Sequence, residues 1–182
     1  MTVTGESDET LMARYSRGDA AAFEVLYRRH EMRVWRYLER NVGNHATADE
    51  LMQEVWFAVA RDAARYEPTA KFTTWLFTIA HNRMIDSIRA SRRQTSLDTL
   101  GYEAEDSSPG PLAETVARDQ AGALIRAFEK LPGEQREAFL LQIEGDLSVE
   151  EIAAVTESSF ETTKSRLRYA RTKLRELLKD YA

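Results

Sequence analysis

The chain has 182 residues, 43% of them hydrophobic, and no cysteine, so it can form one or two small domains but no disulfide and no thiolate metal site. No apolar run approaches the roughly twenty residues that span a membrane, and residues 1–10 lack the apolar core of a secretory signal, so we expect a cytoplasmic protein with no membrane insertion. The net charge of −5 hides two basic parts: residues 11–93 carry fourteen Lys and Arg against ten Asp and Glu, and residues 159–182 carry seven against three.

Helical periodicity fills the first half of the chain after a polar, acidic tail at residues 1–10, which we expect to be disordered. Asp19 can cap a helix that ends near Gly43, and Thr47 with Glu50 has the spacing of a capping box for the next helix. After a loop at residues 66–71, the pattern predicts a helix from Phe72 to Ile88 that is apolar on nearly all sides at first, as a central buried helix should be. Three arginines end it: Arg89, Arg92 and Arg93.

The composition changes between residues 94 and 119, where six acidic residues stand against one basic residue and a Ser-Ser-Pro-Gly-Pro run excludes regular structure. Helical periodicity then returns. Pro132 suits the first turn of a helix that closes at Gly145, a natural C-cap. The predicted fold class is therefore all-α, with two small helical domains at residues 11–93 and 120–182 joined by a flexible acidic linker at residues 94–119.

The segment from Ser148 onward has the pattern of a helix-turn-helix. Ser148 and Glu151 form a capping box for a short helix, and a second helix opens near Glu161 or Thr162. The second helix gathers an inward stripe at helical spacing: Phe160, Thr163, Leu167, Ala170, Leu174 and Leu178. Its other faces carry a basic flank and polar outward positions: Lys164, Arg168, Arg171, Arg175, Ser165, Tyr169 and Thr172. Such a helix enters the DNA major groove in helix-turn-helix proteins, and the simpler alternative is a solvated basic helix.

Patterns typical of catalysis are missing. The glycines form no phosphate-binding loop, and the three histidines lack metal-ligand spacing. The densest carboxylate cluster on one helix is Asp49, Glu50 and Glu54, which we interpret as a solvated face or a docking surface for a basic partner. We therefore predict a protein that is not an enzyme and needs no metal and no cofactor.

Three ordered motifs resemble those of bacterial sigma factors. Residues 48–56 (ADELMQEVW) resemble the D-L-x-Q-E-x-F helix of region 2, and residues 72–82 (FTTWLFTIAHN) resemble the F-x-T-W-L-x-x-I-A-x-N signature that follows it. Residues 131–139, 150–153 and 163–171 resemble region 4. The chain leaves no room for other regions, so it is similar to the extracytoplasmic-function (ECF) group, which keeps only regions 2 and 4.

The resemblance implies a transcription initiation factor that directs core RNA polymerase to promoters by recognising their −35 and −10 elements and helping to melt the DNA. The residues implied for the −35 element are Lys164, Ser165, Arg168, Tyr169 and Arg171, with Arg136 as a phosphate contact. Those implied for the −10 element are Lys71, Phe72, Thr78, His81, Asn82 and Arg83, with Arg89, Arg92 and Arg93 as phosphate contacts. The implied polymerase-binding face is Asp49, Glu50, Gln53 and Glu54. The implied partners are the clamp helices and the flap of core RNA polymerase, promoter DNA and, as a candidate, an anti-sigma factor.

Two alternatives stay open at this point. A conventional helix-turn-helix regulator would bind a specific duplex by itself, usually as a symmetric dimer, with the first domain used for dimerisation or sensing. An adaptor would meet only proteins and would use the basic helix for an acidic partner. Phe72 and Trp75 are candidates for stacking on bases, although aromatic residues at this spacing in an apolar helix are more often core residues.

Overall fold

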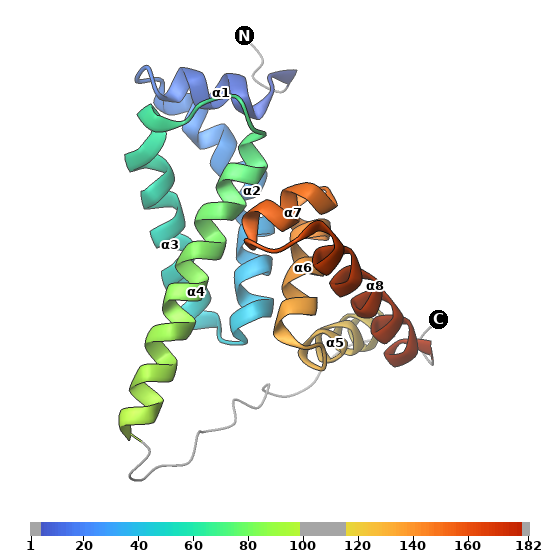
Figure 1. Cartoon of the computed structure of the whole chain (residues 1–182). Coiled ribbons are helices and arrows are strands. Elements are labelled where there is room, and N and C mark those ends of the chain that lie inside the picture. Colours follow the sequence, from blue (N-terminus) through green and yellow to red (C-terminus); the bar gives the residue numbers. More distant parts are fainter. Residues whose placement is uncertain (1–4, 99–115, 180–182) are drawn as a thin grey trace.

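The computed structural model describes residues 5–98 and 116–179, and every regular element within them is helical. In chain order the elements are α1 (Asp8–Tyr15), α2 (Ala20–Val42), α3 (His45–Asp62), the 3-10 helix η2 (Ala63–Arg65), α4 (Phe72–Asp98), α5 (Val116–Glu129), α6 (Gly133–Gly145), α7 (Val149–Val155) and α8 (Phe160–Leu177). Helices α2, α3 and α4 form a long bundle with α1 across one end, and α5–α8 lie against one side of it (Figure 1). We call α1–α4 the N-terminal unit and α5–α8 the C-terminal unit. The predicted all-α class is confirmed, and most of the predicted linker lies outside the described residues.

The caps of the first helices follow the sequence only in part. Asp19 caps α2 as predicted, and Gly43 ends it in the left-handed conformation at a φ of 68°. The prediction of Thr47 as the next cap is wrong, because α3 begins at His45 and the Asn44 side chain accepts the N–H of Thr47. Gly43 reverses the chain by itself, so the next residue can already serve as the N-cap.

Helix α4 begins at Phe72 as predicted but continues to Asp98, through residues that we assigned to the linker. No glycine or proline occurs between these two ends, so nothing in the sequence stops the helix there. The interior of α4 is fixed by fully buried side chains that include Leu76, Phe77 and Ala80. The loop before it is confirmed.

Helix α1 begins at Asp8, inside the tail that we expected to be disordered, and it braces the bundle. The Asp8 carboxylate lies 2.8 Å from Arg29 Nη1 and 2.7 Å from His30 Nε2, both on α2. The Glu9 carboxylate accepts the backbone N–H of Phe72 at 2.9 Å, which satisfies a free amide at the start of α4. Helix α1 therefore connects α2 to α4 through two acidic side chains.

The C-terminal unit turns sharply after α6. Helix α6 ends at Gly145 as predicted, but the left-handed C-cap residue is Asp146, at a φ of 54°, so the prediction of Gly145 as the cap residue itself is wrong. Gly145 is needed for close packing instead, because a Cβ there would lie 2.9 Å from Leu147 Cγ and 3.4 Å from Phe77 Cδ2. The capping box of Ser148 and Glu151 is confirmed.

Helix α8 starts at Phe160, with Ser159 as its N-cap. Four residues of the predicted inward stripe are buried: Thr163, Leu167, Ala170 and Leu174. Phe160 is not, since 41% of its surface is exposed, and its ring lies 5.9 Å from the Lys164 ammonium. As the first residue of α8, Phe160 precedes the turn that packs inward, so the stripe begins one turn later than predicted.

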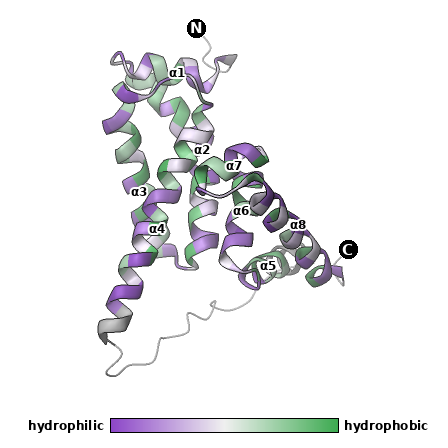
Figure 2. Ribbon diagram, in the orientation of Figure 1, coloured by the Kyte–Doolittle hydropathy of each residue, from purple (hydrophilic) through white to green (hydrophobic). Residues whose placement is uncertain are grey.

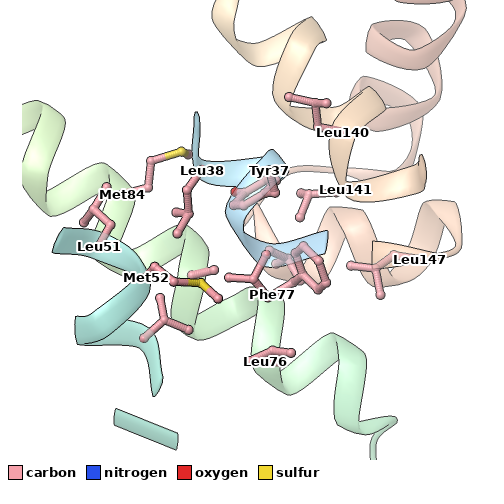
Figure 3. Packing of buried hydrophobic residues seen from close by; sticks show 14 of the residues in the cluster. Tyr37, Leu38, Leu51, Met52, Leu76, Phe77, Met84, Leu140, Leu141 and Leu147 are labelled. Carbon is pink, nitrogen blue, oxygen red and sulfur yellow. The ribbon is translucent and has the colours of Figure 1, made fainter. Parts of the chain in front are cut away.

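The two units share one hydrophobic core, which the expectation of separate domains on a linker did not include. Tyr37 of α2 and Phe77 of α4 lie beside Leu140, Leu141 and Leu147 of the C-terminal unit (Figure 3). Tyr37 and Phe77 meet edge to face with ring centroids 5.3 Å apart. Helix α2 is therefore covered on one side by α3 and α4 and on another by α6.

The Asp8 carboxylate leads to a prediction about stability and pH. Burial by itself would raise the pKa of Asp8, but hydrogen bonds from His30 and Arg29 outweigh burial and hold the pKa below its ordinary value of 3.8. A carboxylate of this kind stabilises the fold above its ordinary pKa, and the stabilisation is lost as the pH falls through the lower, folded-state pKa. We expect Asp8→Asn to reduce the free energy of unfolding at pH 7 by about 1–3 kcal/mol.

The measurement is urea unfolding of both proteins at neutral and acidic pH, and the difference between them should shrink below about pH 4. Asp86→Asn, at an exposed position of α4, is the matched control and should behave as the unaltered chain does. Equal stability of Asp8→Asn and the unaltered chain at pH 7 would show that α1 is not held by this carboxylate.

Candidate nucleic-acid interface

The outer face of α8 presents the residues predicted for the −35 element. Lys164, Arg168, Tyr169 and Arg171 are exposed, and Ser165 is half-buried. The Arg168 guanidinium lies 5.0 Å from the centre of the Tyr169 ring, whose surface is 53% exposed. The structure therefore brings five of the six residues together on one helix, with an arginine and an aromatic ring side by side at the surface.

Helix α8 is held at a fixed angle to α6 by polar contacts that the sequence did not indicate. Arg166 Nη2 donates to Glu134 Oε2 at 2.6 Å, and Arg171 Nη2 donates to Gln142 Oε1 at 2.6 Å. The buried stripe of α8 packs against α6 and α7 on the same side. These contacts leave the opposite face of α8 to the solvent, as a recognition helix requires.

The turn between α7 and α8 is fixed by hydroxyl groups. The Thr156 hydroxyl donates to the Ile152 carbonyl at 2.8 Å, and the Ser158 and Thr163 hydroxyls share a hydrogen bond of 2.8 Å. Between them Glu157 adopts a left-handed conformation at a φ of 50°, which is uncommon for a residue with a side chain. The turn therefore sets the direction of α8 without a glycine.

The residues predicted for the −10 element lie on α4 and at the end of the loop before it. Exposed members are Lys71, Asn82, Arg89, Arg92 and Arg93, and partly buried members are Thr78, His81 and Arg83. Hydrophilic residues follow one another along the C-terminal half of α4, as they do along much of α8 (Figure 2). Two of the predicted residues already have anionic partners, because Lys71 Nζ lies 3.2 Å from Glu151 Oε1 and His81 Nδ1 is hydrogen-bonded to Glu137 Oε1.

Phe72 does not fit the role predicted for it. Its side chain is fully buried, with ring centroids 5.5 Å from His30, 6.1 Å from Tyr66 and 6.0 Å from Trp75, so no face remains for a base. The reason is that α1 and the loop cover the first turn of α4. Phe72 is therefore a core residue, and Trp75 is partly buried against Tyr66.

The loop at residues 66–71 is shaped by Tyr66. Its hydroxyl donates to the Ala70 carbonyl at 3.1 Å. Burial, together with the nearby Glu9 and Asp8 carboxylates, raises the pKa of Tyr66 to about 12, so the phenol stays neutral and keeps its proton for this bond. The loop thereby presents Lys71 at the start of α4.

Arg136 lies away from the outer face of α8. It lines a groove of about 700 Å³ between α4, the turn after α2 and the start of α6, together with Arg89 and Arg92. Burial lowers the pKa of Arg136, and its Nε has no hydrogen-bond partner within the described residues. The structure therefore groups Arg136 with the basic end of α4 rather than with the residues on α8.

The predicted polymerase-binding residues share the outward face of α3. Asp49, Glu50, Gln53 and Glu54 are all exposed, and Asp49 accepts the indole N–H of Trp35 at 2.8 Å. On the same face lies Phe57, with 74% of its surface exposed, which is not among the predicted residues. The periodicity of α3 indicated it, since Phe57 falls outside the buried positions Leu51, Met52, Val55, Trp56 and Val59.

Two features are absent from residues 5–98 and 116–179. None of the helices there combines the length and the apolar character needed to span a bilayer. Over the same ranges, no three His, Asp or Glu side chains converge in a way that would hold a metal ion.

Comparison with protein families gives two matches in the order of the two units. The model of Sigma-70 region 2 matches residues 26–94, and the model of Sigma-70 region 4 matches residues 121–174. The RNA polymerase sigma factor CarQ of Myxococcus xanthus is 34% identical over 168 residues, which is 92% of this chain and 95% of CarQ. The ECF RNA polymerase sigma factor RpoE of Cereibacter sphaeroides is 32% identical over 180 residues, covering 96% of this chain and 98% of that relative.

Solved structures agree in fold. CnrH, in complex with the cytosolic domain of CnrY, aligns with a TM-score of 0.69 at 25% identity and covers 97% of this chain and 100% of its own. The sigma factor RpoE in complex with the anti-sigma factor NepR, from Bartonella quintana, also gives a TM-score of 0.69 at 25% identity, covering 86% of this chain and 96% of its own.

A helical bundle followed by a helix-turn-helix with an exposed basic helix is thus the fold of the two promoter-binding regions of a sigma factor. The chain belongs to the ECF RNA polymerase sigma factors. It is a transcription initiation factor that binds core RNA polymerase and directs it to promoter DNA, and it is not an enzyme. The conventional helix-turn-helix regulator and the adaptor, kept as alternatives from the sequence, are excluded.

Proposed function

We propose a division of roles within this sigma factor. The N-terminal unit, predicted as residues 11–93, binds core polymerase and the −10 element, and the C-terminal unit, predicted as residues 120–182, binds the −35 element and the flap. The observation that best supports this division is the exposed group of Lys164, Arg168, Tyr169 and Arg171 on a helix whose other face is buried. Both promoter contacts take place in the cytoplasm, where the chromosome and core polymerase are found.

For the −35 element, α8 enters the major groove with its outward face. Arg168 is suited to donate to a guanine edge, and Ser165 is suited to either base type. Lys164 and Arg171 lie on the flank and are suited to phosphates. Arg136, in the groove with Arg89 and Arg92, is the phosphate contact that this arrangement supports least.

For the −10 element, Lys71, Thr78, His81, Asn82 and Arg83 provide polar edges around an unstacked base, and Arg89, Arg92 and Arg93 follow the backbone of the separated strand. Phe72 is no longer part of this set because it is buried. The exposed Asn82 is the best placed of these side chains to read a base edge, since an amide both donates and accepts.

For core polymerase, the outward face of α3 offers carboxylates around an exposed aromatic ring. Glu50 and Glu54 attract a basic partner, and Phe57 supplies the apolar centre that such interfaces commonly contain. We assign this face to the clamp helices. An anti-sigma factor is a further proposed partner, supported by the likeness to the RpoE–NepR complex.

The proposed function is tested by transcription in vitro with core polymerase, this chain and a library of promoters. We expect new and specific start sites that need the chain and core polymerase together. Activation only of polymerase that already carries another sigma factor would contradict the proposal.

Arg168→Ala tests the −35 assignment. Loss of a base contact should weaken promoter use by about 1–3 kcal/mol and relax the preference at one −35 position. The measurement is selection of −35 sequences from a randomised promoter pool by holoenzyme. Arg175→Ala removes the same charge in the last turn of α8 and should leave the preference unchanged. An unaltered preference for Arg168→Ala would make Arg168 a phosphate contact.

Glu54→Lys tests the polymerase face. Reversal of an exposed charge should lower the affinity for core polymerase by about tenfold, roughly 1.4 kcal/mol, and leave the fold intact. Affinity is measured by fluorescence anisotropy at physiological salt, with circular dichroism as the check on folding. Glu24→Lys, the same reversal at an exposed position of α2, is the control. Retained affinity would show that the interface lies elsewhere.

A further inference from the structure

The groove between α4, the turn after α2 and the start of α6 has the size of a small-molecule site. Its volume of about 700 Å³ lies within the range of pockets that hold such ligands. Arginines line it from two helices: Arg89 and Arg92 from α4 and Arg136 from α6. A small molecule that entered the groove would therefore meet positive charge from both units.

Arg136 lacks an anionic partner in the part of the chain that the structure describes. Its Nε is buried without a hydrogen-bond acceptor. Burial lowers the pKa of this guanidinium more than the negative charge of Glu129 raises it. A partly buried cation is costly until an anion or an acceptor reaches it, so a bound anion would relieve that cost.

The two glutamates that line the groove do not neutralise it, because both have other partners. The Glu134 carboxylate is 74% exposed and lies 2.6 Å from Arg166 Nη2 of α8. Glu137 accepts the Tyr37 hydroxyl at 2.9 Å. The same carboxylate is hydrogen-bonded to His81 Nδ1. The positive charge of the arginines is therefore left for a ligand.

The remaining lining is apolar and amide-bearing. Val42, Ile85 and Ile88 are partly buried aliphatic side chains, on which a flat base can lie. Within the described residues, the Asn41 amide uses an N–H and the Asn44 amide uses its oxygen in bonds to the backbone. One acceptor and one pair of donors therefore remain for the edge of a base.

We propose that this groove binds a nucleotide, with the phosphates on Arg89, Arg92 and Arg136 and the base against the aliphatic side chains. Guanidinium groups bind phosphate oxygens through paired N–H bonds, and three of them suit a ligand with several negative oxygens. Gly133 also lines the groove, and a Cβ there would have no atom within 4 Å, so the backbone at the start of α6 is open to a phosphate. The site does not depend on the proposed −10 role of α4.

The site is tested by isothermal titration calorimetry of the full chain, with ATP, GTP, inorganic triphosphate and adenosine in EDTA at physiological salt. We expect saturable binding of ATP or GTP to a single site. Inorganic triphosphate should bind about tenfold more weakly because the base contacts are lost, and adenosine should not bind. Absence of saturable nucleotide binding would overturn the site. Triphosphate that binds as tightly as the nucleotides would overturn the contact with a base.

A groove variant with Arg89→Gln and Arg136→Gln locates the site. Loss of two charge-assisted contacts should weaken nucleotide binding by at least about tenfold. The matched control carries Arg17→Gln and Arg175→Gln, which remove the same charge at exposed positions, one in each unit, outside the groove. Circular dichroism checks the fold, and Arg89→Gln with Arg92→Gln repeats the test at exposed positions only. Equal affinities of the control and both groove variants would overturn the assignment.

A bound nucleotide would also share Arg89 and Arg92 with promoter DNA. This consequence, unlike the site itself, rests on the proposed function, which places both arginines on the backbone of the separated strand. A saturating nucleotide should weaken binding of the unaltered chain to single strands of about twelve nucleotides by about tenfold. Strand binding that the bound nucleotide leaves unchanged would overturn the shared contacts. Failure of the proposed function is seen separately, as a chain that selects no promoter with core polymerase, whichever nucleotide it binds.

Discussion

Helix α2 packs against α3 and α4 on one side and against α6 on another, and the arrangement of the two units depends on these contacts. Its residues Leu26, Val34 and Leu38 are fully buried in the bundle, while Tyr37 reaches Glu137 of α6. One turn holds Arg36, Tyr37 and Arg40, which all contact the C-terminal unit. The buried side chains on both sides of α2 belong to one contiguous hydrophobic core, so a change on one side affects the packing of the other. The relative position of the units is thus set by a helix that belongs to only one of them.

The C-terminal unit carries its negative and positive charges on different parts of the chain: residues 120–158 are acidic overall and residues 159–182 are basic overall. A uniformly basic unit would bind phosphates but would repel the basic bundle, and a uniformly acidic one would do the reverse. Placing carboxylates on α6 and α7 and cations on α8 lets one small unit meet both surfaces. The ion pairs of the buried Glu144 with Arg36 and Arg40 fix how the two units pack more than they add net stability, because the cost of removing charges from water offsets most of their attraction.

Local features of the fold were readable from the sequence, and long-range ones were not. The caps at Asp19 and Ser148 and the buried stripe of α8 follow from short-range rules of spacing and hydrogen bonding. Two caps were predicted wrongly because a second residue with a cap or turn propensity stood nearby. Asn44 caps α3 in place of Thr47, and Asp146 caps the end of α6 in place of Gly145.

The candidate site was likewise predicted where it depends on local sequence. The helical period of α8 places Arg168 and Tyr169 on its exposed face, because the face of a helix is set by nearby residues alone. The burial of Phe72 depends on contacts with α1, so the pattern of α4 alone does not indicate it. The exposure of Phe57 follows from the helical period of α3. Glu144 and Arg36 are 108 positions apart in the sequence, so no helical period of either helix indicates their contact.

The hydrogen bond from the Phe72 amide to Glu9 ties the beginning of the chain to the loop that carries Lys71. Removing α1, or fusing a tag that unwinds it, would release that amide and leave the loop without its anchor. With the proposed −10 role of the N-terminal unit, damage at this end would be expected to slow strand separation at promoters whose duplex contacts are still intact.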